Sequence, residues 1–154
     1  DEDVEDKFVL PDEVEDDLPC GMTPVLRREL ILSILSNATD AALLQTPSDP
    51  RSTAAEWLIG QDELYLCPSD PKLVQRWTLA LVYFSTGGDD WFKCSAEPSQ
   101  QEQEAEQECG EVYPFQSGED RFLSALNECR WAGIKCNEDL CVTEVEFELN
   151  NLIG

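Results

Sequence analysis

The segment that decides the fold is Val142-Thr-Glu-Val145-Glu-Phe147-Glu-Leu-Asn150-Asn-Leu152-Ile-Gly154. Its apolar residues, its Asn and its Gly stand at the spacing L-x-x-L-x-L-x-x-N-x-L-x-G. Because side chains alternate along a strand, we expect Val145 and Phe147 to point inward, and Glu144, Glu146 and Glu148 to point outward. We expect Asn150 to turn the chain, because an Asn side chain can bond backbone groups that a sheet leaves unpaired. An ordinary edge strand followed by an Asn-Asn turn is the alternative.

A cysteine-flanked segment precedes this strand: Cys129-Arg-Trp131-Ala-Gly133-Ile134-Lys-Cys136. The two segments together resemble the start of plant-type extracellular leucine-rich-repeat proteins, where a C-x-W-x-G-[IV]-x-C cap precedes the first repeat. A first repeat has no neighbour on its outer side, so a terminal unit must cover its apolar edge. The resemblance implies that Cys129 pairs with Cys136 and that Trp131 and Ile134 form the cover. We expect Trp131 to be buried against Val145 or Phe147.

The region upstream narrows the resemblance to diatom and other stramenopile leucine-rich-repeat proteins. It contains Pro47-Ser-Asp-Pro50 through Ala54-Ala-Glu-Trp57-Leu58, and then Gln75-Arg-Trp77-Thr-Leu-Ala-Leu-Val-Tyr-Phe-Ser-Thr-Gly-Gly-Asp-Asp-Trp91. The similarity covers residues 47–154, with three departures from the family pattern. These are Ala55 in place of Leu, Trp77 in place of Tyr, and a Glu/Gln-rich insert at 97–108.

The charge of the chain is concentrated in two acidic segments. The formal net charge is −23 in 154 residues, and residues 1–17 hold ten acids and one Lys. We interpret residues 1–18 as a solvated tail and 97–111, which adds six acids and no base, as an exposed acidic loop. These segments leave 19–96 as a helical region and 112–154 as the cap and first repeat. A nucleic acid is an improbable partner, because its phosphates repel this charge.

Seven cysteines favour disulfides and an oxidising compartment. The absence of His argues against zinc, although a four-Cys site stays an alternative. Beyond the cap pair, Cys94 with either Cys109 or Cys141, and Cys20 with Cys67, are open pairings, and the odd count leaves one thiol free or bound to another chain. Asn37-Ala-Thr39 is a glycosylation sequon, which matters only in the secretory pathway. The sequence holds no signal peptide and no membrane span, so we interpret it as a processed or partial product.

Three helices are predicted by a shared start signal, a capping oxygen followed by Pro, at Thr23-Pro24, Asp49-Pro50 and Asp70-Pro71. The first helix has an apolar stripe at helical spacing, made of Leu26, Leu30, Ile34 and Ala38 with Ile31 and Leu35 beside it. The second should bury Ala54, Trp57 and Leu58 and end at Gly60. The third is predicted over 71–85, with Gly87-Gly88 after it. A fourth short helix is predicted over 120–126.

The sequence offers little catalytic chemistry. Without His, a Ser-His-Asp or Cys-His device cannot be built, and Gly87-Gly88 lacks the Lys of a phosphate-binding loop. The carboxylate pairs Asp89-Asp90 and Glu138-Asp139 are consistent with solvated turns, and weak calcium binding is the alternative. We therefore expect no enzyme activity and no cofactor.

These features predict a mainly α protein with a small C-terminal β segment, in which a helical cap leads into the first strand of a leucine-rich-repeat solenoid. The resemblance implies a non-enzymatic protein–protein interaction module that is extracellular or at the cell surface. Its partners would bind the face that begins with Glu144, Glu146 and Glu148, or the open last repeat. An acidic secreted matrix protein, with cation-dependent assembly, is the alternative function. A subunit of a larger complex in another oxidising lumen is a third.

Overall fold

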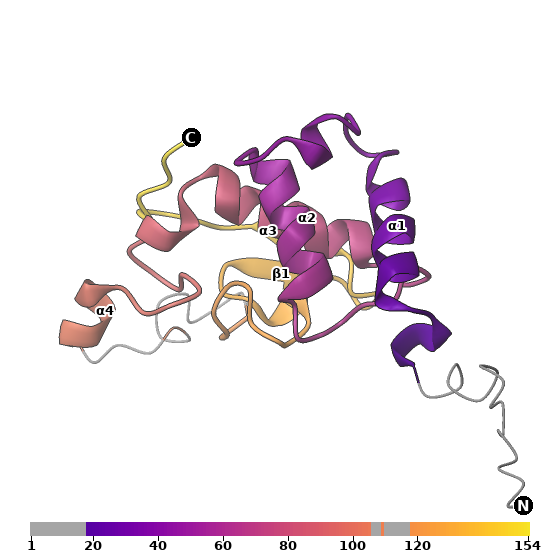
Figure 1. The fold of residues 1–154 in the computed structure, drawn as a ribbon. Coiled ribbons are helices and arrows are strands. Elements are labelled where there is room, and N and C mark those ends of the chain that lie inside the picture. Colours follow the sequence, from indigo (N-terminus) through magenta and orange to yellow (C-terminus); the bar gives the residue numbers. More distant parts are fainter. Residues whose placement is uncertain (1–17, 106–108, 110–117) are drawn as a thin grey trace, which may run out of the picture.

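The computed structural model describes residues 18–105, 109 and 118–154 (Figure 1). Most of the acidic tail and residues 106–108 and 110–117 lie outside these ranges, so the tail expected at 1–17 is not addressed. The described part is mainly helical and carries one small antiparallel sheet near its C-terminal end, as the sequence predicts. It contains no solenoid. Each of its helices is too short or too polar to cross a bilayer.

The three main helices begin at or near their predicted starts. Helix α1 spans Pro24–Leu35, and Thr23 Oγ1 accepts a hydrogen bond from the backbone N–H of Leu26 at 3.2 Å. Helix α2 spans Pro50–Gly60 and is capped by the Asp49 carboxylate. Helix α3 spans Leu73–Ser85, two residues later than predicted, because Pro71 and Lys72 lie in a turn held by Asp70. Local cap chemistry therefore sets where α1 and α2 start.

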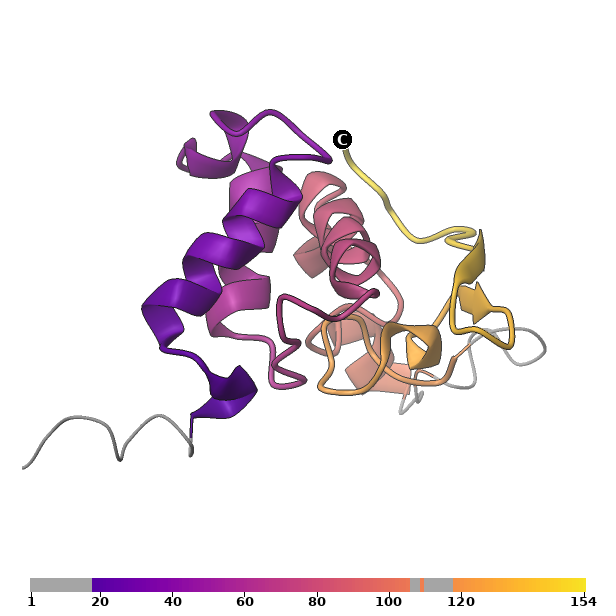
Figure 2. The same cartoon turned by 90° about the vertical axis from the view of Figure 1, so that its right-hand side faces the viewer.

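Helices α2 and α3 form the centre of the structure, and α1 lies along the outside of α2 (Figure 2). The side chains between them are apolar and almost inaccessible to solvent. The aromatic end of this core extends to the C-terminal segment, where Trp91, Phe122 and Trp131 are each at most 1% exposed. The largest apolar side chains that are fully buried in this core are Ile31, Leu35, Leu58, Leu73, Tyr83, Trp91, Phe122, Trp131 and Ile134.

The predicted core face of α1 is confirmed at Ile31 and Leu35, which are buried, but wrong for most of the stripe beside them. Leu26 and Leu30 are 44% and 39% exposed, Ala38 is exposed, and Ile34 is only partly buried. The helix instead buries a face made of Arg27, Ile31 and Leu35.

Arg27 explains this rotation, because its buried guanidinium has backbone acceptors. Its Nη1 donates to the carbonyl of Ile59 at 2.8 Å, and its Nη2 and Nε donate to the carbonyl of Leu66 at 2.9 and 3.1 Å. Ile59 lies in the last turn of α2, where a cation is favoured by the helix dipole. The guanidinium also lies 3.8 Å from the ring centroid of Tyr65. A satisfied Arg can therefore occupy a position that an apolar pattern would assign to Leu.

The sheet is a hairpin of β1, Ile134–Cys136, and β2, Val142–Val145. The strands are antiparallel, with Ile134 opposite Val145 and Lys135 opposite Glu144. The turn is closed by Asn137, whose Oδ1 accepts from the backbone N–H of Cys141 at 2.9 Å. Gly133 precedes β1 with φ +83°, and a Cβ there would lie 2.3 Å from the carbonyl oxygen of Glu146. Only glycine allows the two backbone segments to approach this closely.

Two expectations about the connecting segments are wrong. Residues 120–126 form no helix, because this stretch runs beside the cap: Asp120 pairs with Trp131 in an isolated bridge, and the backbone N–H of Phe122 donates to the carbonyl of Cys94. Part of the acidic insert expected as an exposed loop is helix α4, Gln100–Ala105. Glu102 within it is only 3% exposed.

Candidate interaction surface

Three disulfides tie the described segments together. Cys129 pairs with Cys136 at an S–S distance of 2.03 Å, which links the short helix η7, Glu128–Arg130, to β1. Cys20 pairs with Cys67, and Cys94 pairs with Cys109 rather than with Cys141. Each pair is among those considered from the sequence. Cys141 is the remaining free thiol, and the Lys72 ammonium lies 2.9 Å from its sulfur.

Trp131 is fully buried, but its neighbours differ from those expected. Its ring lies 5.1 Å from Phe122 and 6.1 Å from Trp57, measured between centroids, and its Nε1 donates to Ser124 Oγ at 3.0 Å. Phe147 is not a ring partner of Trp131 among the described aromatic contacts, and it packs on Trp91 and Phe122 instead. Trp131 therefore joins the C-terminal segment to α2, a long-range contact that local spacing does not reveal.

Arg76 on α3 is a buried hub of hydrogen bonds that no pattern in the sequence indicates. Its guanidinium makes a bidentate pair with Asp62, at 2.6 Å for both bonds, and Nη1 lies 3.4 Å from Glu128 Oε2. The same group donates to the carbonyls of Ser124 and Leu126 at 2.9 and 2.8 Å. All three charged side chains are at most 5% exposed. These hydrogen bonds compensate for the desolvation of the buried charges, and they attach residues 124–128 to α3.

Gln75, next to this hub, positions the start of β2. Its Nε2 donates to Glu128 Oε1 at 2.7 Å and to the carbonyl of Leu140 at 2.9 Å. Its Oε1 accepts from the backbone N–H of Val142, also at 2.9 Å. Helix α3 therefore sets the position of the strand through one amide side chain.

Asn150 fastens the end of the repeat-like segment to the body of the protein. Its side chain is 2% exposed; Oδ1 accepts from the backbone N–H of Lys93 at 2.7 Å, and Nδ2 donates to the carbonyl of Lys93 at 3.0 Å. Beside it, Asn151 Nδ2 donates to the carbonyl of Asp90, and the N–H of Ile153 donates to the carbonyl of Thr86. We call this set of bonds the Asn150 clasp. It satisfies backbone groups, as expected for this Asn, but 57 residues away in the chain.

The candidate interaction face runs along β2 and the residues after it. The acids Glu144, Glu146 and Glu148 are exposed as predicted, and Glu144 forms an ion pair with Lys135. Val145 was expected to point inward, but its exposed fraction is 47%. In the segment after β2, Leu149, Leu152 and Ile153 are 79%, 40% and 60% exposed. Residues 144–153 therefore present both acidic and apolar side chains to solvent.

The Glu102 carboxylate holds α4 to the body. Its Oε2 accepts from the N–H of Ser99 while Ser99 Oγ accepts from the N–H of Glu102, and its Oε1 accepts from the N–H of Cys94. Arg121 lies 3.3 Å away. Burial raises the pKa of Glu102, but the bonds from Cys94, Ser99 and Arg121 outweigh it and lower the pKa. The S-x-x-E motif at 99–102 is a capping box, a signal in the sequence that predicts this helix start.

The other candidate residues lie outside residues 142–153. Asn37 is exposed after α1, and its Nδ2 donates to the carbonyls of Ser33 and Ile34. Asp89 accepts a hydrogen bond from Tyr83 at 2.6 Å; burial, and then this bond, raise the pKa of Tyr83. Glu138 and Asp139 are exposed in the β1–β2 turn. Within the described ranges, no group of three Cys, Asp or Glu side chains converges to hold a metal ion.

Residues 85–91 contact residues 147–153 through the clasp and the Trp91–Phe147 rings. Asn37 and Cys141 take no part in this contact. A scan against models of protein families, a search of curated proteins and a search of solved structures each find no match to this chain.

Proposed function

We propose that this chain is a non-enzymatic protein–protein interaction module that caps the start of an extracellular leucine-rich-repeat solenoid. The Asn150 clasp is the observation that carries the proposal. It seats the only repeat-like segment of the described chain on a helical body, through two bonds to the Lys93 backbone. A terminal unit that must hold a first repeat needs such an attachment.

The apolar part of the candidate interaction face fits the stacking role. Val145 and Ile153 are 47% and 60% exposed, although the matching positions of a repeat are expected to be covered by the next one. Exposed apolar side chains that lie together mark contact sites. We assign these residues to stacking, and we assign the glutamate row to the beginning of the recognition surface.

The disulfides support a location in the secretory pathway. Three bonds join six of the seven cysteines, a usage that suits an oxidising compartment and that reducing cytosol does not maintain. The exposed position of Asn37 makes its sequon accessible to glycosylation. Both features are consistent with a secreted or cell-surface protein.

A fusion experiment tests the stacking role. Two consensus leucine-rich repeats joined after Gly154 should raise the urea midpoint of the cap and lower its fluorescence with a hydrophobic dye, because they cover the exposed apolar face. The matched control is the same fusion carrying Val145→Asp and Ile153→Asp, which should lose both effects. A fusion that melts like the separate parts would contradict the proposal.

A further inference from the structure

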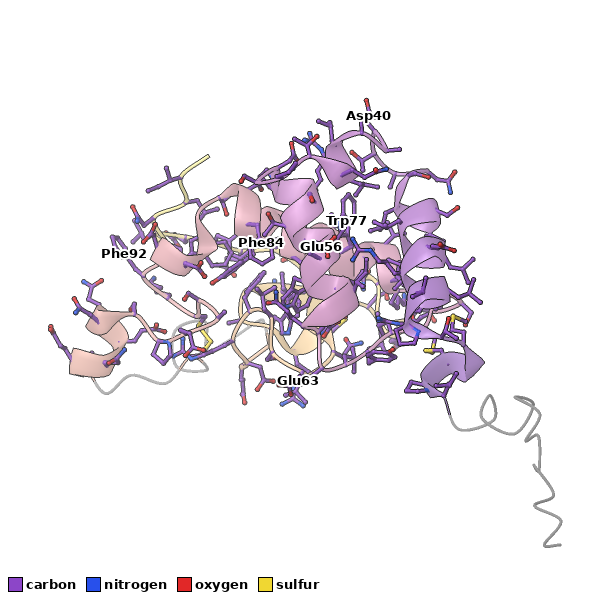
Figure 3. The ribbon with its side chains drawn as sticks, in the orientation of Figure 1. Asp40, Glu56, Glu63, Trp77, Phe84 and Phe92 are labelled. Carbon is purple, nitrogen blue, oxygen red and sulfur yellow. A yellow bond between two sulfur atoms is a disulfide. The ribbon has the colours of Figure 1, made fainter. Side chains whose placement is uncertain are left out.

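A second surface is formed around Phe92, and it reaches Leu149 in the segment after β2. Two neighbouring cavities share Phe92 and Gln101 in their walls, with volumes of about 460 and about 360 Å³. The first lies between the short helix η5, Gly88–Asp90, and α4; the second extends to Leu149. Phe92 is 47% exposed, and Figure 3 places it between the end of α3 and α4. We call these two cavities the Phe92 groove.

The first cavity has a one-signed charge. Its walls contain Asp89, Asp90 and Glu104, and they contain no basic residue. In the described part of the chain none of these three acids forms an ion pair, and no three of its acidic or thiol groups converge on a metal position. Spread carboxylates beside an aromatic ring suit an extended organic cation, which the ring face also attracts.

The second cavity has a different character. Leu149, at 79% exposed, and Ala105 line it together with the Phe92 ring. Lys93 is also in its wall, but its ammonium is directed to the carbonyl of Glu148 at 3.4 Å. This cavity suits an apolar side chain. A free polyamine would leave it empty, whereas a protein segment can fill both cavities at once.

The walls are held in place before any ligand arrives. Ser99 Oγ donates to the carbonyl of Phe92 at 2.9 Å, the capping box fixes the start of α4, and the disulfide between Cys94 and Cys109 closes the segment between them. Because its side chains and backbone are already ordered, the groove loses less conformational entropy when a ligand binds.

We infer that the Phe92 groove binds an extended, basic segment of a partner protein, in which one Arg or Lys side chain enters the acidic cavity and a neighbouring apolar side chain enters the cavity beside Leu149. The charge complementarity carries this choice of occupant, since the chain has a net charge of −23 and every charged residue in the wall of the first cavity is acidic. The inference rests on the proposed role as an interaction module, but not on the stacking of repeats.

The test uses the full chain with its disulfides intact and a fluorescein-labelled peptide of alternating Arg and Leu, followed by fluorescence anisotropy. Binding should weaken as salt is added. The double variant Asp90→Asn, Glu104→Gln should weaken it about threefold to tenfold, and Phe92→Ala about twofold to fivefold. These side chains are exposed, so the variants should fold, which near-UV circular dichroism checks.

Matched controls separate a groove from diffuse attraction. The double variant Glu29→Gln, Glu63→Gln removes the same charge from exposed positions elsewhere and should bind like the parent. An equal loss in this control would overturn the inference, as would equal binding of a peptide in which Ser replaces every Leu. Spermine that displaces the peptide at the same concentration would overturn the protein partner in favour of a polyamine. Loss of peptide binding leaves the fusion experiment unaffected, so the two proposals fail separately.

Discussion

Replacing Arg76 by Met tests whether the buried hub holds the cap on the helices. Met preserves much of the length and apolar contact of the side chain, but leaves Asp62 and Glu128 as buried carboxylates without a cation. Removing one partner of a buried ion pair typically costs about 3–5 kcal/mol. The carbonyls of Ser124 and Leu126 also lose their donor. We therefore expect the free energy of unfolding to fall by about 3–5 kcal/mol, a large fraction of the stability of an ordinary domain.

The assay is urea unfolding at neutral pH, followed by far-UV circular dichroism, with the disulfides oxidised. Arg28→Met is the matched control, because the Arg28–Glu56 pair lies at the surface with side chains 44% and 48% exposed. An exposed pair contributes about 0–1 kcal/mol, so this variant should lose little. If Arg76→Met lost no more than Arg28→Met, the hub would not carry the attachment that we describe.

Three further predictions concern the cap and α4. Trp131→Ala should cost about 3–5 kcal/mol in the same assay, because it empties a site between aromatic rings; a melting temperature close to that of the parent would contradict this packing. Replacing both Cys129 and Cys136 by Ser should cost about 2–3 kcal/mol, and non-reducing peptide mapping that joins either cysteine to another would refute the pairing. The lowered pKa of Glu102 means that its stabilising effect is present above its ordinary pKa of 4.5 and is lost as the pH falls through its folded value. The protection factors of the amides in residues 94–105, taken relative to the intrinsic exchange rate at each pH, should therefore fall in acid in the parent, and Glu102→Gln, already weakened at neutral pH, should show no such step.

The sequence predicted those features that depend on neighbours along the chain. The starts of α1 and α2 follow from a capping side chain and a Pro, which act within one helical turn. The Cys129–Cys136 pair followed from the family resemblance. The capping box at Ser99 and Glu102 was equally local, but the Glu/Gln-rich composition around it led to a loop interpretation.

The features that the sequence did not predict depend on contacts between distant segments. Arg27 and Arg76 are buried because carbonyls and carboxylates from other elements surround them, and an apolar pattern treats every Arg as a surface residue. Val145 is 47% exposed, and whether another segment covers a strand cannot be read from the alternation of residues along it. For the candidate interaction face, the positions of the glutamates were therefore predictable, and the mixture of acidic and apolar side chains was not.

The Asn150 clasp has a consequence for the order of folding. It joins groups 57 residues apart, and the Gln75–Val142 bond joins groups 67 apart, whereas α2 and α3 are neighbours in the chain. Closing a long loop loses conformational entropy before the stabilising contact can form. We therefore expect the pair α2 and α3, which are close in sequence, to form earlier than the clasp. During synthesis the clasp residues also leave the ribosome after the helices. We expect the seating of Asn150 to complete folding, and its release to be the first step when the protein unfolds.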